Sequence, residues 1–404
     1  MIKQLKSLGP GLLFAGAAIG VSHLVQSTRA GADFGFGLLW ALVLIHLFKY
    51  PFFQYGPRYA TATGESLLDG YHKLGKGVLI TYFLLNLATM FTIQAAVTIV
   101  TAGLAISLFG FTNDPITWSI IITIVGLIIL LRGRYHFLDN LMKIIIVTLT
   151  ITTIASVLVA TLNTTNTFTF TQILPKETLE IGFLIAFLGW MPAPLDVSIW
   201  QSLWAIEKQK ENKEFNTKKS IFDFNVGYII TLFLGFCFLT LGTIVMYQSG
   251  EDFSGSAGKF SQQLISLYTD TIGESMYVFI GIAAFTTMFS TTLTTLDASP
   301  RAMTRTVELL SNKVAKKMYW FWIFFLAIGT ILILKFFLSE MGTLIKIATI
   351  LSFLTAPFYA IINFVLISGK NTPKEWRPST GMKILSYLGI FFLIGFSAWY
   401  LMNL

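Results

Sequence analysis

The chain has 404 residues, of which 54% are hydrophobic and only 12% charged, and its formal net charge is +8 at pH 7. Because a soluble domain carries about 25% charged residues, this composition excludes an ordinary water-exposed surface and indicates that lipid surrounds the protein. The single cysteine, Cys237, excludes an intrachain disulfide framework and a cysteine metal cluster.

Apolar segments of about 20 residues, the length that spans a bilayer, recur along the chain. They predict an all-α integral membrane protein, multi-pass, with about eleven transmembrane helices in one domain over residues 1–404. No small-residue cleavage site follows the first apolar run, so we interpret that run as a retained helix and not as a signal peptide. The expected helices are 9–31 (interrupted), 35–60, 77–109, 115–132, 137–162, 180–204 (interrupted), 221–247, 275–297, 318–338, 342–368 and 380–402.

Basic residues indicate how these helices are oriented. With the N-terminus inside, about 20 Lys and Arg residues fall on the cytoplasmic side and about four outside, as the positive-inside rule requires. This distribution accounts for the net charge, so we expect no nucleic-acid partner. An odd number of helices then places the C-terminus outside. Lys49 and Arg58, which we place near helix ends, are expected to extend their charged groups to the interface.

Two of the expected helices are interrupted by residues that disfavour a regular helix. The stretch "GAAIGVSH" lies inside the first, and "GWMPAPLDVSIW" places Pro192 and Pro194 two residues apart in the sixth. Each proline removes a backbone donor and clashes with the preceding turn, so the pair is expected to open about one turn of helix. Unwound backbone at membrane depth persists only where it is buried in protein or lines a wet cavity.

Broken helices in corresponding positions of two halves are typical of the substrate site of a transporter. The interrupted segments are five helices apart, which fits two inverted five-helix repeats, over about 9–162 and about 180–368, with an extra helix at about 380–402. Gly16 and Gly20 taken alone also fit a helix-packing face. Their pairing with the broken sixth segment favours the substrate site.

Several motifs resemble the Nramp (natural resistance-associated macrophage protein) family of metal-ion transporters. The first segment reads "GPGLLFAGAAIGVSHLVQSTRAGADFGFGLLW", with the opening "GP" and the later "GFGLLW" at the family's spacing. "TATGESL" (61–67), "MP" (191–192) and "TAPF" (355–358) resemble the family's elements after helix two and in helices six and ten. The resemblance implies a leucine-transporter-like arrangement with the N-terminus inside, in the plasma (inner) membrane of a bacterium.

The chain departs from the family at the metal site itself. The family's helix-one motif is Asp-Pro-Gly-Asn, and this chain has Gly20, Val21, Ser22 and His23 at those positions. The family's helix-six Met-Pro-His becomes Met191-Pro192-Ala193, which loses the histidine linked to proton movement. We therefore interpret the chain as a divergent, Nramp-related branch.

The candidate substrate site combines side chains and backbone of both interruptions. Softer metal ions accept imidazole and thioether ligands, whereas Mg²⁺ and Mn²⁺ favour oxygen. His23, Met191 and Asp196 are the candidate metal ligands, and His23 and Asp196 are also the candidates for proton coupling. Alternatively, His23 is a neutral, hydrogen-bonded core residue, and Asp196 caps the second half of helix six. The full set of substrate-binding candidates is Ala17, Gly20, Ser22, His23, Leu188, Met191 and Asp196.

These features predict a secondary-active, alternating-access transporter for a divalent metal cation, with proton coupling as a candidate feature. The alternative is the same fold carrying a small organic acid or amino acid, because free N–H groups at half-helix N-termini attract anionic groups. Asp297 and Arg301, four residues apart in helix eight, are predicted to form an ion pair or a gate. We expect no enzyme activity and no cofactor. The expected partners are membrane lipid and a small solute or metal ion, and the sequence gives no basis for an oligomeric state.

Overall fold

The computed structural model describes residues 9–131, 135–164, 167–247, 254, 256–274, 277–311, 317–336 and 341–403, with only the backbone for 135–145 and 270–272. Every regular element among these residues is helical. The main helices are α2 (Pro10–Ala18), α3 (Thr28–Phe34), α4 (Leu39–Thr63), α6 (Lys76–Phe109), α7 (Pro115–Leu131), α8 (Tyr135–Asn163), α9 (Thr178–Trp190), α10 (Val197–Glu211), α11 (Thr217–Val245), α13 (Tyr277–Ser311), α14 (Met318–Phe336), α15 (Met341–Ser368) and α16 (Thr380–Met402).

Eight helical stretches in the described residues are long and apolar enough to cross a membrane, and α7 and α9 are shorter apolar helices. The expected all-α membrane architecture is confirmed, while the exact number of crossings and the cytoplasmic N-terminus stay predictions. Large apolar side chains are exposed on the peripheral helices, including Phe391 (77% exposed) on α16 and Phe279 (66% exposed) on α13. Such surfaces are stable in lipid and would aggregate in water.

Two short helices occupy connections for which the sequence predicted only loops. They are α5 (Leu67–Leu74) and α12 (Ala257–Ile272). In α5, the Ser66 and Asp69 side chains form a reciprocal capping box, and the apolar face is buried. In addition, α13 extends to Ser311, well past the predicted end at 297, and contains Pro300. Helix eight therefore projects farther toward α5 than expected.

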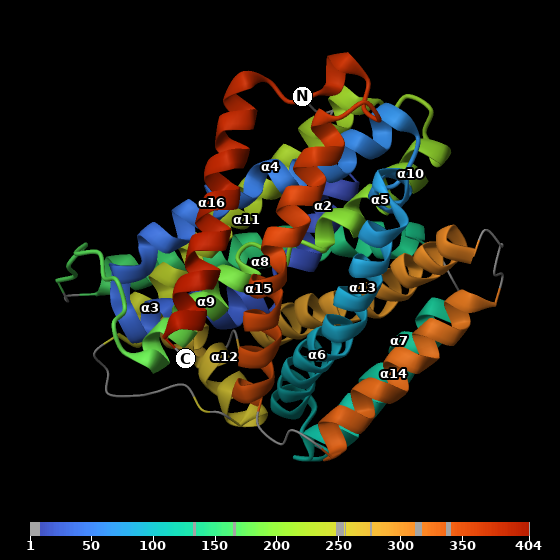
Figure 1. Cartoon of the computed structure of the whole chain (residues 1–404). Helices are drawn as coiled ribbons and strands as arrows, with labels where there is room; N and C mark the ends of the chain where they lie inside the picture. The colour runs from blue at the N-terminus through green and yellow to red at the C-terminus, as the bar shows by residue number, and fades with distance from the viewer. Residues whose placement is uncertain are drawn as a thin grey trace.

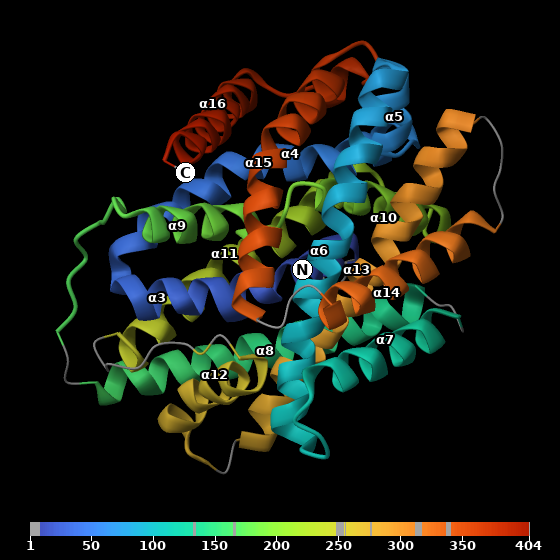
Figure 2. The ribbon, with the colours of Figure 1, turned by 60° about the horizontal axis from the view of Figure 1, so that its bottom comes forward.

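The broken helices lie in the middle of the bundle, with α11 packed along helix one and α4 along α10. Figures 1 and 2 show α16 at one edge of the molecule, beside α15 and α4, and the α7–α14 pair at another edge. Glycines allow the close contact between α2 and α11, because a Cβ at Gly227 would lie 2.0 Å from the Gly11 carbonyl oxygen. The Asp223 carboxylate of α11 also accepts the N–H groups of Gly9 (3.0 Å) and Gly11 (2.8 Å), which fixes the start of α2.

Candidate functional site

The first helix breaks where the sequence predicts. Helix α2 ends at Ala18, Gly20 has the non-helical angles φ −128° and ψ −124°, and Val21–Ser27 continues as a π-helix. Gly20 also has no room for a side chain, because a Cβ there would lie 2.8 Å from the Thr291 hydroxyl oxygen. The Thr291 hydroxyl donates to the Gly16 carbonyl (3.1 Å), so α13 holds the end of α2.

The sixth helix breaks at the two prolines. Helix α9 ends at Trp190, α10 begins at Val197, and the residues between them are not helical. Although Asp196 precedes α10, its side chain makes no capping hydrogen bond. The predicted unwinding of both segments is confirmed, and each break leaves carbonyl groups that need donors from elsewhere.

The donor for the sixth-helix break is Lys49 of α4. Its Nζ donates to the carbonyl oxygens of Leu188 (2.8 Å), Gly189 (2.7 Å) and Ala193 (3.1 Å). The side chain is completely buried. The expectation that Lys49 extends to the membrane interface is therefore wrong. We placed Lys49 near a helix end, although it lies inside the predicted helix 35–60. That depth was the signal that could have identified it, since an ionisable residue at membrane depth is a functional candidate.

His23 faces α11 from the start of the π-helix. Its Nε2 lies 2.9 Å from the Thr231 carbonyl oxygen, and its Nδ1 lies 2.7 Å from the Ser22 hydroxyl and 3.1 Å from the Ala18 carbonyl. The Ser22 hydroxyl also donates to the Ala18 carbonyl. Both ring nitrogens of His23 thus have protein partners in this conformation, and the imidazole connects the first break to α11.

Met191 is also buried on the α11 side of the breaks. The Ser27 hydroxyl donates to its sulfur at 3.6 Å. A Cβ placed on Gly235 of α11 would lie 3.0 Å from the Met191 methyl carbon and 3.7 Å from Cδ2 of His23. Gly235 therefore provides the space in which both predicted soft ligands sit.

Asp196 is 3% exposed, and its Oδ1 has no hydrogen-bond partner within the described part of the chain. The Tyr82 and Tyr359 hydroxyls, which are buried and interact electrostatically with Asp196, also lack partners there. Sequence reasoning missed both tyrosines, because they come from α6 and α15. Among the described residues, no group of three His, Cys, Asp or Glu side chains could hold a metal ion.

A small cavity of about 30 Å³ separates the two breaks. Helix one contributes Ala17 and Ser22, the helix-six break contributes Ala193 and Pro194, and α13 contributes the Thr291 hydroxyl among others. Of the predicted binding residues, Ala17 and Ser22 thus line this cavity. The other predicted residues are not part of its lining: Gly20, His23, Leu188, Met191 and Asp196.

Two larger cavities lie at opposite ends of broken helix six. The α5-side vestibule, about 530 Å³, is lined by the α10 end of that helix together with α5, α13 and α14. The α12-side vestibule, about 350 Å³, is lined by the α9 end together with α3, α12 and α15, and includes Arg29 and Lys346. The breaks and the small cavity between them thus separate two vestibules.

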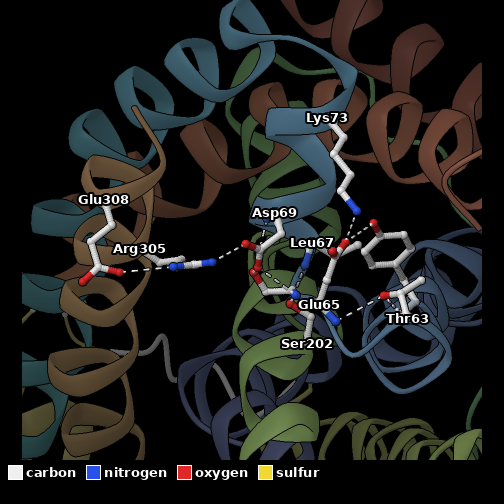
Figure 3. Close-up of polar contacts among 10 residues, drawn as sticks. Thr63, Glu65, Leu67, Asp69, Lys73, Ser202, Arg305 and Glu308 are labelled. Atoms are coloured by element: carbon white, nitrogen blue, oxygen red, sulfur yellow. Dashed lines mark hydrogen bonds and ion pairs between the residues drawn. The ribbon is translucent and has the colours of Figure 1, made fainter. Parts of the chain in front are cut away.

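A polar contact joins α5 to α13 across the α5-side vestibule. Arg305 forms an ion pair with Asp69, and Glu308 lies 3.3 Å from Arg305 on the same helix (Figure 3). The Leu67 N–H donates to the Ser202 hydroxyl of α10 (3.0 Å), so α5 also holds helix six. We call the Asp69–Arg305 pair the α5 latch.

The α5 latch affects the acidity of Asp69. Burial acts to raise the pKa of this carboxyl group. The hydrogen bonds from Ser66 and Arg305, together with the charge of Arg305, outweigh that effect, so the pKa lies below its ordinary value.

Asp297 and Arg301 form the predicted i,i+4 ion pair, with 2.6 Å between Arg301 Nε and Asp297 Oδ2. Both residues lie on α13. The Tyr319 hydroxyl of α14 donates to Asp297 (2.5 Å), so the carboxylate also joins α13 to α14. Both members line the α5-side vestibule.

The whole chain matches one protein family. Residues 11–403 fit the model described as natural resistance-associated macrophage protein-like. The chain is also 36% identical, over 397 residues, to an uncharacterized protein of Pasteurella multocida (strain Pm70), covering 97% of this chain and 90% of that protein.

The chain belongs to the Nramp family.

Solved structures show the same fold for this Nramp-family chain. A manganese transporter of Eremococcus coleocola aligns over 98% of this chain and 85% of its own, with a TM-score of 0.76 and 12% identity. A nucleobase-cation-symport-1 family transporter in a closed conformation aligns over 97% and 92%, with a TM-score of 0.62 and 14% identity. The arrangement is therefore leucine-transporter-like, as predicted.

Family and fold are those of transporters and support a multi-pass secondary metal-ion transporter, and the organic-solute alternative is not favoured. This Nramp-family chain has Gly20 and Ala193 where the family motifs have an aspartate and a histidine. Its site also contains a buried cationic side chain, Lys49. The scaffold of the family is present, and the chemistry at its centre differs.

Proposed function

We propose that this chain carries a divalent metal cation across the plasma (inner) membrane of a bacterium by alternating access, with its N-terminus in the cytoplasm. The α5-side vestibule then opens to the cytoplasm and the α12-side vestibule to the outside. The repeats at about 9–162 and about 180–368 would move against each other, with the helix at about 380–402 outside them.

The size of the cavity between the breaks is the observation that carries this proposal. Its volume of about 30 Å³ exceeds the minimum of about 10–15 Å³ that a cavity needs to hold one water molecule. Pockets for organic ligands enclose about 300–1,000 Å³. A dehydrated or nearly dehydrated ion fits between Ser22 and Ala193, whereas an organic acid or amino acid does not.

The donors around the cavity are mainly neutral oxygen atoms. Ser22, Thr291 and Thr295, which carry hydroxyls, line it, and so does Ala193, whose carbonyl accepts from Lys49. Asp196 supplies the nearest buried carboxylate of broken helix six, and Met191 a softer sulfur donor. A proton-coupling role for Asp196 or His23 remains part of the proposal, because both are buried and ionisable in the centre of the membrane.

Uptake by the purified protein in liposomes tests this proposal. Liposomes loaded with a metal-sensitive dye are mixed with Mn²⁺, Fe²⁺ or Mg²⁺, and we expect saturable uptake of at least one of these ions. Melting temperatures measured with the same ions should rise for the ion that is carried, because binding to the folded state adds to its stability. No flux and no thermal shift with any of them, together with uptake of an organic acid, would contradict the proposal.

A further inference from the structure

The Lys49 ammonium occupies a site that has the shape of a cation-binding site. Three carbonyl oxygens lie within 3.1 Å of its Nζ, and all three come from broken helix six. Leu188 and Gly189 belong to the last turn of α9, where the helix dipole adds negative potential. Carbonyl oxygens of this kind also coordinate metal ions where helices unwind in transporters.

These carbonyls need a positive partner whenever the site is closed. Leu188, Gly189 and Ala193 are buried, and an unsatisfied carbonyl at membrane depth is strongly unfavourable. Lys49 reaches them from α4, a separate element, and is 0% exposed. The Asp196 carboxylate interacts electrostatically with Lys49 and balances part of its charge.

The Lys49 site and the central cavity share one residue, Ala193. Ala193, whose carbonyl accepts from Lys49, also lines that cavity together with Ser22. A cation bound in this cavity lies beside the residue whose carbonyl Lys49 holds, and would compete with Lys49 for that oxygen. Two positive charges competing for one oxygen repel each other, so one of them must move.

We propose that Lys49 is an internal substitute for the transported cation: its ammonium holds the helix-six carbonyls while the protein is empty and yields them when the cation binds. This inference rests on the proposed function, because it concerns the same site. It assigns Lys49 to the return of the empty transporter. With cation bound, the carbonyls have their partner and the closed state forms without Lys49.

Comparing two modes of transport distinguishes a role of Lys49 in the return of the empty protein from a role in every step of transport. Net uptake requires the protein to return empty, whereas exchange of labelled for unlabelled metal ion across the liposome membrane does not. For Lys49→Met, which keeps the chain length and removes the charge, we expect net uptake to fall by about tenfold or more relative to exchange, the effect of losing one charge-assisted hydrogen bond. Equal losses in both modes, or no loss in either, would overturn the inference.

Stability measurements test the same point without transport. In Lys49→Ala, methylammonium should restore the melting temperature, because it places an ammonium group at the three carbonyls, and tetramethylammonium should not because it has no N–H donor. The wild-type protein should respond to neither. Lys49→Gln retains a donor without charge and serves as the second variant if the others fold poorly, with an intermediate melting temperature expected. Lys335→Met, which changes an exposed lysine at the end of α14, is the matched control.

The two proposals fail in different ways. Wild-type liposomes that show neither uptake nor exchange of any metal ion contradict the proposed function, and the methylammonium result still decides whether Lys49 acts as an internal cation. Wild-type metal transport combined with a Lys49→Ala protein that is as stable as wild type, and indifferent to methylammonium, contradicts the Lys49 inference alone.

Discussion

At the scale of single residues, the centre of the molecule is organised by partners that lie far apart in the chain. Lys49 binds carbonyls that follow it by 139 to 144 positions, and His23 contacts a carbonyl 208 positions later. As predicted, His23 lies at the first break, in the π-helix that follows Gly20. Its two ring nitrogens are engaged by α2 and α11, so in the closed state the ring joins the break to its neighbour.

Replacing His23 by alanine should destabilise the protein. The substitution removes the imidazole contacts to the Thr231 and Ala18 carbonyls, and it leaves a cavity in the buried interior. The Thr231 carbonyl keeps its helical partner in α11, and the Ala18 carbonyl keeps the Ser22 hydroxyl and the Gly20 N–H. The expected loss is about 1–3 kcal/mol, seen as a lower melting temperature. His23→Gln, which can restore one donor, should recover part of it. A melting temperature equal to that of the wild type, with metal affinity reduced, would instead show that His23 acts only as a ligand.

At the scale of elements, the two broken helices and the short helix α5 act together. Helix α5 contacts helix six through Ser202 and helix eight through the α5 latch. The sequence contained the pattern for this helix, since Ser66 and Asp69 are spaced as a capping box, although with Asp in place of the usual Glu or Gln. Eight residues are too few for a clear periodicity, which is why α5 was not predicted.

Breaking the α5 latch should open the α5-side vestibule toward the central cavity. Arg305 is 40% exposed at its side chain and Asp69 15%, so the pair is worth only about 0.5–1 kcal/mol. For Arg305→Ala we expect Thr295→Cys, in a Cys237→Ala background, to react with a thiol reagent about two- to fivefold faster. Glu207→Ala, which removes an exposed pair with Lys210 in the same vestibule, is the control. Unchanged labelling in Arg305→Ala would show that the latch does not restrict access.

The pH dependence of the α5 latch follows from the lowered pKa of Asp69. A carboxyl group whose pKa is lower in the folded protein contributes stability above the pKa of the unfolded chain, about 4, and this contribution is lost as the pH falls through the folded value. Between pH 5 and 8 we therefore expect labelling of the Thr295→Cys protein to be independent of Asp69 titration. Because the reactive thiolate fraction falls with pH in every variant, the labelling rate is compared with that of Asp69→Asn at the same pH, and the ratio of the two rates should rise toward one below about pH 4. A rise near neutral pH that Asp69→Asn abolishes would contradict this assignment.

At the scale of the whole molecule, two vestibules of unequal size are separated by packed, unwound backbone. The larger is bordered by charged residues of α5, α10 and α13, and the smaller by Arg29 and Lys346. This arrangement is the one expected of a transporter in a closed conformation, because the two vestibules and the cavity of about 30 Å³ between the breaks share no lining residue. Alternating access then requires only that one side loosens at a time.

The orientation in the membrane is testable with single cysteines. Cys237 is buried, at 4% exposed, so the background labelling is expected to be low. A cysteine at Lys213, in the α10–α11 connection, should be inaccessible to a membrane-impermeant thiol reagent in intact cells. A cysteine at Lys176, before α9, should react. The reverse pattern would show that the N-terminus is outside.

The amino-acid sequence by itself determined that lipid surrounds the protein, that its fold is helical, which family it belongs to, and the two places where helices unwind. Each of these depends on local composition or on short motifs: low charge, apolar runs, glycines beside Ser22, and the prolines at 192 and 194. The partners of the unwound backbone were decided only by tertiary structure. Lys49 was expected at the interface, because a lysine in a membrane helix commonly extends its ammonium group to the nearer water interface. Only the packing of α4 against helix six shows that three carbonyl oxygens lie within reach instead.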